Sequence, residues 1–272
     1  MLSEYFSPEI ANKLDCFINI QEIRIRLNQN ITVLDALGLN ELDEKTGKQE
    51  ILNIFSSLCN FSVYAKQQEI KSGFITLPEG HRVGICGRCV VENGELKNIS
   101  NITSLNIRIA REFLDCSKKI YNGINENIDH TVIISPPNCG KTTYLRDLTR
   151  LLSNSGKNVT VVDERGEIAP FAEENKFDLG KNTDVLQYCP KDKGLMLVLR
   201  TMNPEIIVTD EIGTNNDAEA VSEITKSGVT MITSFHGSSI EDFKERFPKW
   251  NEFKYAVFLN KQKEVDRIIC LR

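Results

Sequence analysis

The 272-residue sequence has no long apolar run. A helix that spans a bilayer needs about 20 consecutive apolar residues, and no stretch of this chain approaches that length. Residues 1–15 carry acidic side chains early and lack an apolar core of signal-peptide length, so the chain shows no export signal. We therefore expect a cytoplasmic protein whose membrane contacts, if it makes any, are peripheral or go through a partner.

The chain is also short of histidine and of closely spaced cysteine pairs. It has three histidines and eight cysteines, and only Cys86 and Cys89, in the stretch CGRC, form a close C-x-x-C pair. A tetrahedral zinc site needs four ligands, and the sequence offers no second C-x-x-C and no histidine pair to complete one. In a chain without an export signal we interpret the cysteines as reduced thiols, and this pair as small residues of a glycine-rich strand pair.

An excess of basic charge is missing as well. The 33 lysines and arginines are outnumbered by 38 aspartates and glutamates, which gives a net charge of −5, and no part of the chain is a basic block. Nucleic-acid-binding proteins usually carry a basic face, so we expect no direct nucleic-acid partner. The hydrophobic share of 40% is ordinary for a globular protein, and the length suffices for one large or two ordinary domains.

The first part of the chain, residues 1–112, predicts a small α+β domain. In QEIRIRL, isoleucines alternate with arginines, which is strand periodicity. Asn93-Gly94 is a turn signal between two runs of strand character and predicts a β-hairpin. The predicted elements are a helix over 1–20, strand structure over 21–34, a helix centred near 48–59, a second helix and a short strand before residue 78, a hairpin over 81–99, and a strand over 104–112.

The second part, residues 113–272, begins with a helix and linker and then alternates strands with helices. That alternation predicts a largely parallel, doubly wound sheet, in which ligands bind at the carboxyl ends of the strands. The predicted strands are 130–135, 158–163, 205–211, 229–235 and a final hairpin of 254–260 and 264–272, and the predicted helices are 141–156, 192–203 and 216–228.

The stretch SPPNCGKTT, residues 135–143, lies between a predicted strand and a predicted helix and resembles a phosphate-binding loop. In the pattern G-x-x-x-x-G-K-[ST], backbone N–H groups cradle phosphates, the lysine reaches the β- and γ-phosphates, and the hydroxyl of the last residue holds Mg²⁺. We therefore expect ATP and Mg²⁺ as ligands. Serine replaces the first glycine. The candidate nucleotide-binding residues are Ser135, Pro136, Pro137, Asn138, Cys139, Gly140, Lys141, Thr142 and Thr143, and Thr142 is also a candidate metal ligand.

A second apolar strand, EIIVTDE, ends in two acids that complete this chemistry. Asp210 is expected to hold Mg²⁺ through water, and Glu211 to orient and deprotonate the attacking water. Two more strands of the same predicted sheet end in VVDERGE, which contains Glu164, and in TSFHG, which contains His236. We expect His236 to lie where the γ-phosphate would be sensed.

These stretches together resemble the stage III sporulation protein AA family, which belongs to the type II and type IV secretion (pilus) ATPases. The resemblance runs over nearly the whole chain and includes VVDERGEIA, LRTMNPEIIVTDEIG, SGVTMITSFHG and, upstream, EIRIRL, GHRVGICGR and ITSLNIRIARE. It implies a RecA-like P-loop ATPase domain behind a smaller N-terminal α+β domain. It also implies a homo-oligomer, a hexamer, that acts in the mother cell, docks on membrane proteins and powers a sporulation channel to the forespore.

The resemblance also assigns roles to residues. Residues 135–143 match the Walker A loop, Glu211 the catalytic acid of Walker B, Glu164 the Asp box and His236 the His box. The serine at position 135 puts the rate of turnover in doubt more than nucleotide binding. Ring ATPases take an arginine from the neighbouring subunit to stabilise transition-state charge. The candidates are Arg24, Arg26, Arg82, Arg88, Arg108 and Arg111 in the first domain and Arg200 in the second.

Three other functions stay open at this point. A nucleic-acid-associated P-loop ATPase is one, because the family also resembles a plastid and cyanobacterial group of P-loop proteins. An ATP-binding scaffold with negligible turnover is another, and Ser135 is the reason to consider it. A small-molecule kinase is less favoured, because the sequence shows no obvious lid for an acceptor.

Overall fold

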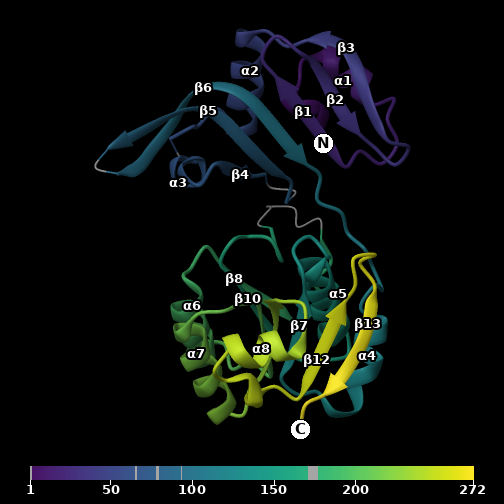
Figure 1. Cartoon of the computed structure of the whole chain (residues 1–272), viewed down its shortest axis with the longest axis vertical. Coiled ribbons are helices and arrows are strands. Elements are labelled where there is room, and N and C mark those ends of the chain that lie inside the picture. The colour runs from purple at the N-terminus through teal and green to yellow at the C-terminus, as the bar shows by residue number, and fades with distance from the viewer. Residues whose placement is uncertain (1, 65, 78–79, 93, 171–176) are drawn as a thin grey trace. The chain divides into compact units, whose positions relative to one another are not determined.

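A computed structural model of the chain describes residues 2–64, 66–77, 80–92, 94–170 and 177–272. The chain divides into two compact units, Met1–Arg111 and Glu112–Arg272 (Figure 1). Within the described ranges, no helix combines the length and the apolar character needed to cross a bilayer. The assignment of 1–112 and 113–272 as separate domains stays a prediction.

The first unit is a fully antiparallel sheet of six strands in the order β3-β2-β1-β6-β5-β4. Its strands are β1 (Glu22–Arg26), β2 (Asn30–Leu34), β3 (Leu39–Lys45), β4 (Phe74–Thr76), β5 (Arg82–Glu92) and β6 (Glu95–Arg108). Its helical elements are η1 (Leu2–Tyr5), α1 (Pro8–Leu14), α2 (Lys48–Leu58) and α3 (Gln67–Lys71).

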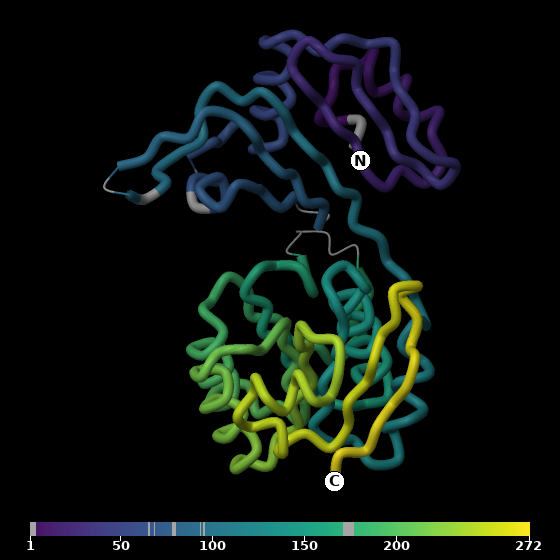
Figure 2. Tube along the Cα trace, viewed as in Figure 1, coloured from purple at the N-terminus to yellow at the C-terminus, as the bar shows by residue number. Residues whose placement is uncertain are grey.

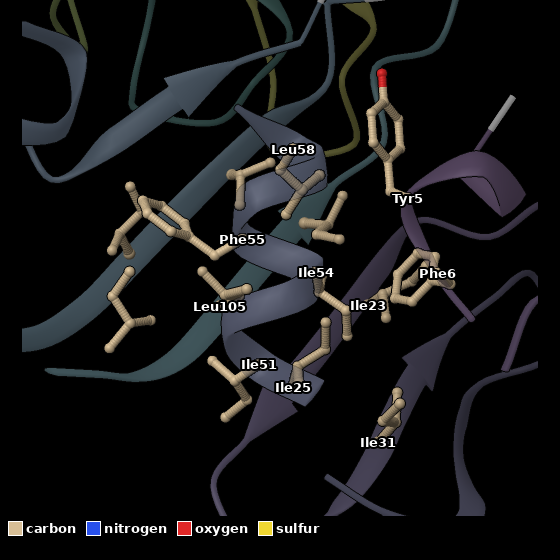
Figure 3. Packing of buried hydrophobic residues seen from close by; sticks show 14 of the residues in the cluster. Tyr5, Phe6, Ile23, Ile25, Ile31, Ile51, Ile54, Phe55, Leu58 and Leu105 are labelled. Carbon is tan, nitrogen blue, oxygen red and sulfur yellow. The ribbon is translucent and has the colours of Figure 1, made fainter. Parts of the chain in front are cut away.

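The core of this unit follows from two periodicities. On β1, Ile23 and Ile25 are buried while Arg24 between them is exposed, as a period of two requires. On α2, the apolar residues Ile51, Ile54, Phe55 and Leu58 recur at a spacing of three and four residues and are buried. Figure 3 shows this helix face packed against the isoleucines of β1 and Leu105 of β6.

The structure corrects parts of the predicted outline. The single helix expected over 1–20 is a short 3-10 turn followed by α1, which begins at Pro8, where proline is tolerated because the first N–H of a helix has no partner. The separate strand expected over 104–112 is the end of β6, which runs on from the hairpin. Asn93 of the predicted turn lies outside the described residues, and Gly94 has a φ of 80°.

The second unit contains a seven-stranded sheet in the order β13-β12-β7-β11-β10-β8-β9. All neighbouring strands are parallel except the final hairpin, so the predicted doubly wound sheet and hairpin are both confirmed. The strands are β7 (Thr131–Ser135), β8 (Val159–Asp163), β9 (Thr183–Gln187), β10 (Ile206–Ile212), β11 (Thr230–His236), β12 (Tyr255–Leu259) and β13 (Val265–Cys270). In Figure 2 the hairpin is the yellow segment that ends at the C-terminus.

Helices cover both faces of this sheet and bury a separate apolar cluster on each. On one face lie α4 (Lys118–Ile124), the short η2 (Asn125–Asn127) and α5 (Lys141–Asn154). On the other lie α6 (Lys191–Thr201), α7 (Asn215–Lys226) and α8 (Ile240–Arg246), and η3 (Trp250–Glu252) follows α8 in the chain. This order places the carboxyl ends of β7, β11 and β10 side by side at one edge of the sheet.

Candidate nucleotide-binding site

The loop between β7 and α5 has the geometry that phosphate binding needs. Gly140 is the N-cap of α5 and has a φ of 89°, a conformation that costs an L-residue energy. A Cβ added there would find its nearest neighbour at 3.9 Å, so the backbone conformation, rather than crowding, requires glycine. The loop therefore leads into the positive end of a 14-residue helix, where N–H groups are free to bind an anion.

The structure also explains why serine is tolerated at position 135. Ser135 is the last residue of β7, its backbone is that of an extended strand, and its side chain is 1% exposed. Its hydroxyl donates to the carbonyl of Pro136 at 3.0 Å, so the added polar atom is satisfied. Besides Gly140, the loop residue with left-handed backbone is Asn138, a type that adopts this conformation more readily than most. The backbone at position 135 therefore does not require a glycine.

Lys141 folds back over this loop. Its Nζ lies 3.2 Å from the carbonyl oxygen of Ser135 and 3.4 Å from that of Pro136. Burial lowers the pKa of Lys141, and the negative charge of Glu211 partly offsets that effect. A bound anion would interact favourably both with this half-buried ammonium and with the positive end of the helix beside it. Thr142 and Thr143 follow it in the first turn of α5 and are half-buried.

Strands β11 and β10 bring His236 and Glu211 to this loop. His236 pairs in register with Ser135, and Glu211 pairs with Ser234, so the ends of three strands meet. His236 Nδ1 lies 3.2 Å from Glu211 Oε2. The side chains of His236 and Glu211 are 36% and 41% exposed, so both remain accessible to solvent. The structure therefore brings the loop, Glu211 and His236 together at one edge of the sheet.

Asp210 has a partner that the sequence reasoning did not single out. Lys191, the first residue of α6, is 9% exposed, and its Nζ lies 3.1 Å from Asp210 Oδ1. Burial raises the pKa of Asp210 to about 6, against the opposing effect of the Lys191 charge. The ammonium also donates to the main-chain carbonyl of Glu211. The only feature of the sequence that marks Lys191 is its place at the start of a helix, directly after a Cys-Pro pair.

The stretch after β8 is organised by Asp163 rather than by Glu164. The buried Asp163 carboxylate accepts the N–H groups of Glu167, Ile168 and Ala169 at 3.0, 2.9 and 2.8 Å. Burial raises the pKa of Asp163, and these N–H donors oppose the rise. Glu164 is exposed in the turn that they close, at the same edge of the sheet. No contact to the phosphate loop is described for Glu164.

Arg146 holds the same stretch from the helix side. This buried residue of α5 donates from Nε to the carbonyl of Ile168 and from Nη2 to that of Glu167, both at 2.7 Å. Its guanidinium also lies over the ring of Phe177, 4.0 Å from the ring centroid. The stretch after β8 is thus fixed from both sides relative to the helix that begins at the phosphate loop.

Arg200 is not brought to this site. It lies near the end of α6 and lines a hollow with Pro204 and Val229, which come just before β10 and β11 begin. The phosphate loop lies at the carboxyl ends of these strands, so Arg200 is at the opposite edge of the sheet. A catalytic role for Arg200 would have to be exerted on a neighbouring subunit, and it stays a prediction.

The residues present fit a Mg²⁺–nucleotide. No group of three or more metal-ligating His, Cys, Asp or Glu side chains occurs in the described part of the chain. Mg²⁺ with a nucleotide does not need one, because it keeps several waters and takes ligands from the phosphates and one or two protein oxygens. Thr142, in the first turn of α5, is one candidate oxygen beside the loop, and the Asp210 carboxylate, paired with Lys191 at the end of β10, is the other candidate.

Solved structures with this fold define its class. The chain superposes on the Legionella pneumophila ATPase DotB with a TM-score of 0.62 and 15% identity, and the match covers 92% of this chain and 73% of DotB. Over 92% of this chain and 76% of the other, it superposes on the ADP-bound pilus retraction motor PilT with a TM-score of 0.65 and 12% identity. The fold is therefore that of a RecA-like P-loop ATPase domain with a smaller N-terminal α+β domain.

Sequence comparison then identifies the family. Residues 9–271 match the family described as sporulation stage III, protein AA. The chain is 40% identical over 237 residues to stage III sporulation protein AA of Bacillus subtilis (strain 168), covering 85% of this chain and 77% of that protein. The chain belongs to the sporulation stage III protein AA family.

Proposed function

We propose that this protein is an ATP-hydrolysing oligomeric motor that powers a sporulation channel between mother cell and forespore. One observation carries the enzymatic part of this proposal. Lys141 of the phosphate loop, Glu211 at the end of β10 and His236 at the end of β11 converge at one edge of the sheet, with His236 Nδ1 3.2 Å from Glu211 Oε2. Membership of the sporulation family supports the channel role.

In the proposed mechanism, the loop over 135–143 binds the ATP phosphates through its N–H groups and through Lys141. Thr142 and Asp210 would hold Mg²⁺, which neutralises charge on the phosphates. Glu211 orients the attacking water and accepts its proton, and His236 fixes the direction of the Glu211 carboxylate through their contact. Glu164, exposed at the same edge, is proposed as the second acid.

The assembly is also a proposal. The similarity to DotB and PilT supports a common fold. From it we infer a homo-oligomer, a hexamer that closes as a ring, with each site completed by an arginine of the neighbouring subunit. Arg200, whose own subunit leaves it far from the phosphate loop, is one candidate for that arginine. We place the ring in the mother-cell cytoplasm, held at the membrane by proteins of the channel.

Equilibrium binding of a fluorescent ATP analogue with Mg²⁺ tests the site. Lys141→Ala removes the charge that meets the phosphates, and we expect affinity to fall by about tenfold or more. Lys226→Ala is the matched control, because Lys226 is an exposed lysine of the same unit that lies at the C-terminal end of α7. Equal affinity of wild type and Lys141→Ala, with both folded, would contradict nucleotide binding at this loop.

A further inference from the structure

Strand β10 is irregular at the end that carries Asp210 and Glu211. Val208 pairs with Ile232 and Glu211 pairs with Ser234, so two residues of β10 lie opposite one residue of β11. Such a bulge takes backbone groups out of the regular ladder and changes the direction of the side chains that follow. The direction of the Glu211 side chain therefore depends on how the bulge is held.

Two side chains hold the carbonyl groups at this bulge. Thr233 of β11 donates from its hydroxyl to the carbonyl of Asp210. Lys191 of α6 donates to the carbonyl of Glu211. Two side-chain donors thus bind the carbonyls of Asp210 and Glu211, one from the neighbouring strand and one from α6.

Lys191 is unusual for a lysine at the start of a helix. It is 9% exposed, whereas Lys193 two residues later is exposed. Burying an ammonium is costly unless it is paired and hydrogen-bonded. Its two described contacts are both with the acidic pair of β10: 3.1 Å to Asp210 Oδ1, and the hydrogen bond to the Glu211 carbonyl.

We propose that Lys191 is a positioning residue of the candidate ATPase site, which holds the bulged end of β10 and so aims the Glu211 carboxylate at His236. The inference rests on the proposed function in one respect, that Glu211 acts on the attacking water. Lys191 itself touches the main chain and Asp210. Its effect on catalysis is exerted through the direction of the Glu211 side chain.

The test compares Lys191→Met, which keeps the apolar stem and removes the charge, with Lys191→Arg, which keeps the charge. Lys193→Met is the matched control on the same helix. For each folded variant, kcat and KM for ATP are measured together with the dissociation constant of a fluorescent ATP analogue and the melting temperature. We expect Lys191→Met to lower kcat by about tenfold to a hundredfold and to change the dissociation constant by less than about twofold. We expect the kcat of Lys191→Arg to lie between that of Lys191→Met and that of the wild type.

Combination with Glu211→Gln separates positioning from a general structural effect. If Lys191 acts through Glu211, adding Lys191→Met to Glu211→Gln lowers kcat no further, because residues that act as a unit are not additive. A full additional loss would overturn the proposal, and so would wild-type kcat in a folded Lys191→Met protein. If Lys191→Met does not fold, Lys191→Arg decides: an unchanged kcat overturns the proposal, and a lowered kcat with unchanged nucleotide affinity supports it.

The same measurements distinguish failure of this inference from failure of the proposed function. If the wild type hydrolyses ATP and Lys191→Met does so at the same rate, the inference about Lys191 is overturned and the proposed function is not. Tight nucleotide binding by an oligomeric wild type without any turnover overturns both, because Glu211 would then have no water to activate.

Discussion

At the scale of single residues, His130 links the stability of the second unit to pH. His130 is 5% exposed, and its Nδ1 accepts the N–H of Met231 at 3.0 Å, which requires the unprotonated nitrogen. Burial lowers the pKa of His130, with Asp129 and Glu252 opposing and Arg272 reinforcing the shift. The unfolded chain takes up the proton near pH 6.5 and the folded chain only below that. The contribution to stability is therefore complete above about pH 6.5 and is lost as the pH falls.

His130→Asn tests this link. The shorter side chain retains an acceptor for the Met231 N–H but does not titrate in this range. We expect the free energy of unfolding of the wild type to fall more than that of the variant between about pH 7.5 and pH 5.5. Urea denaturation of both proteins at several pH values measures the difference. Parallel curves over this range would show that His130 does not contribute.

The residues of the phosphate loop could be predicted from the sequence, and the residues that support the site could not. Gly140 and Lys141 belong to a local pattern, so the spacing alone identifies them. Lys191 reaches Asp210 only because α6 begins beside the end of β10, and that contact joins positions 19 residues apart (210 − 191). Asp163 was visible as the end of a strand, but its hydrogen bonds depend on the turn that follows it.

At the scale of elements, the start of α7 is fixed by a capping box directly after β10. Thr214 Oγ1 accepts the N–H of Asp217 at 3.1 Å. The Asp217 carboxylate in turn accepts the N–H groups of Gly213 and Thr214, both at 2.9 Å. These bonds satisfy N–H groups that a helix start leaves free. They also hold the chain just beyond Glu211, so the cap supports the site as well as the helix.

Thr214→Ala removes half of this capping box. We expect the free energy of unfolding to fall by about 1 kcal/mol, the usual effect of losing a threonine cap. Asn216→Ala is the control, because Asn216 is exposed in the same first turn. Chemical denaturation followed by circular dichroism measures both variants. An equal effect of the two substitutions would mean that the cap bonds do not stabilise α7.

Elements with strong periodicity could be predicted, and weakly patterned ones could not. The helix expected over 216–228 is α7, and the strand expected over 205–211 is the main part of β10. Strands β3 and β9 were missed because both lie at sheet edges and are largely exposed or half-buried, so no apolar alternation marks them. Helix α8 was missed because it has seven residues and buries only Phe243 fully.

At the scale of the whole molecule, the alternation of strands and helices was enough to predict the fold class of the second unit. The strand order could not be read from the sequence, because it depends on which crossovers the chain makes. That order decides the chemistry: β11 lies between β7 and β10, so His236 stands between the phosphate loop and Glu211. The proposed assembly into a ring would depend on surfaces between chains, which neither local pattern nor strand order reveals.

The central claim, an oligomeric ATPase whose water-activating residue is Glu211, is tested most directly by ATP turnover over a series of protein concentrations. Lys141→Ala and Glu211→Gln are measured alongside, with the mass of each sample followed by light scattering. We expect activity per subunit to rise with concentration as larger assemblies form, to disappear in Lys141→Ala, and to fall to a small residual rate in Glu211→Gln. Hydrolysis by Glu211→Gln at the wild-type rate would contradict the account.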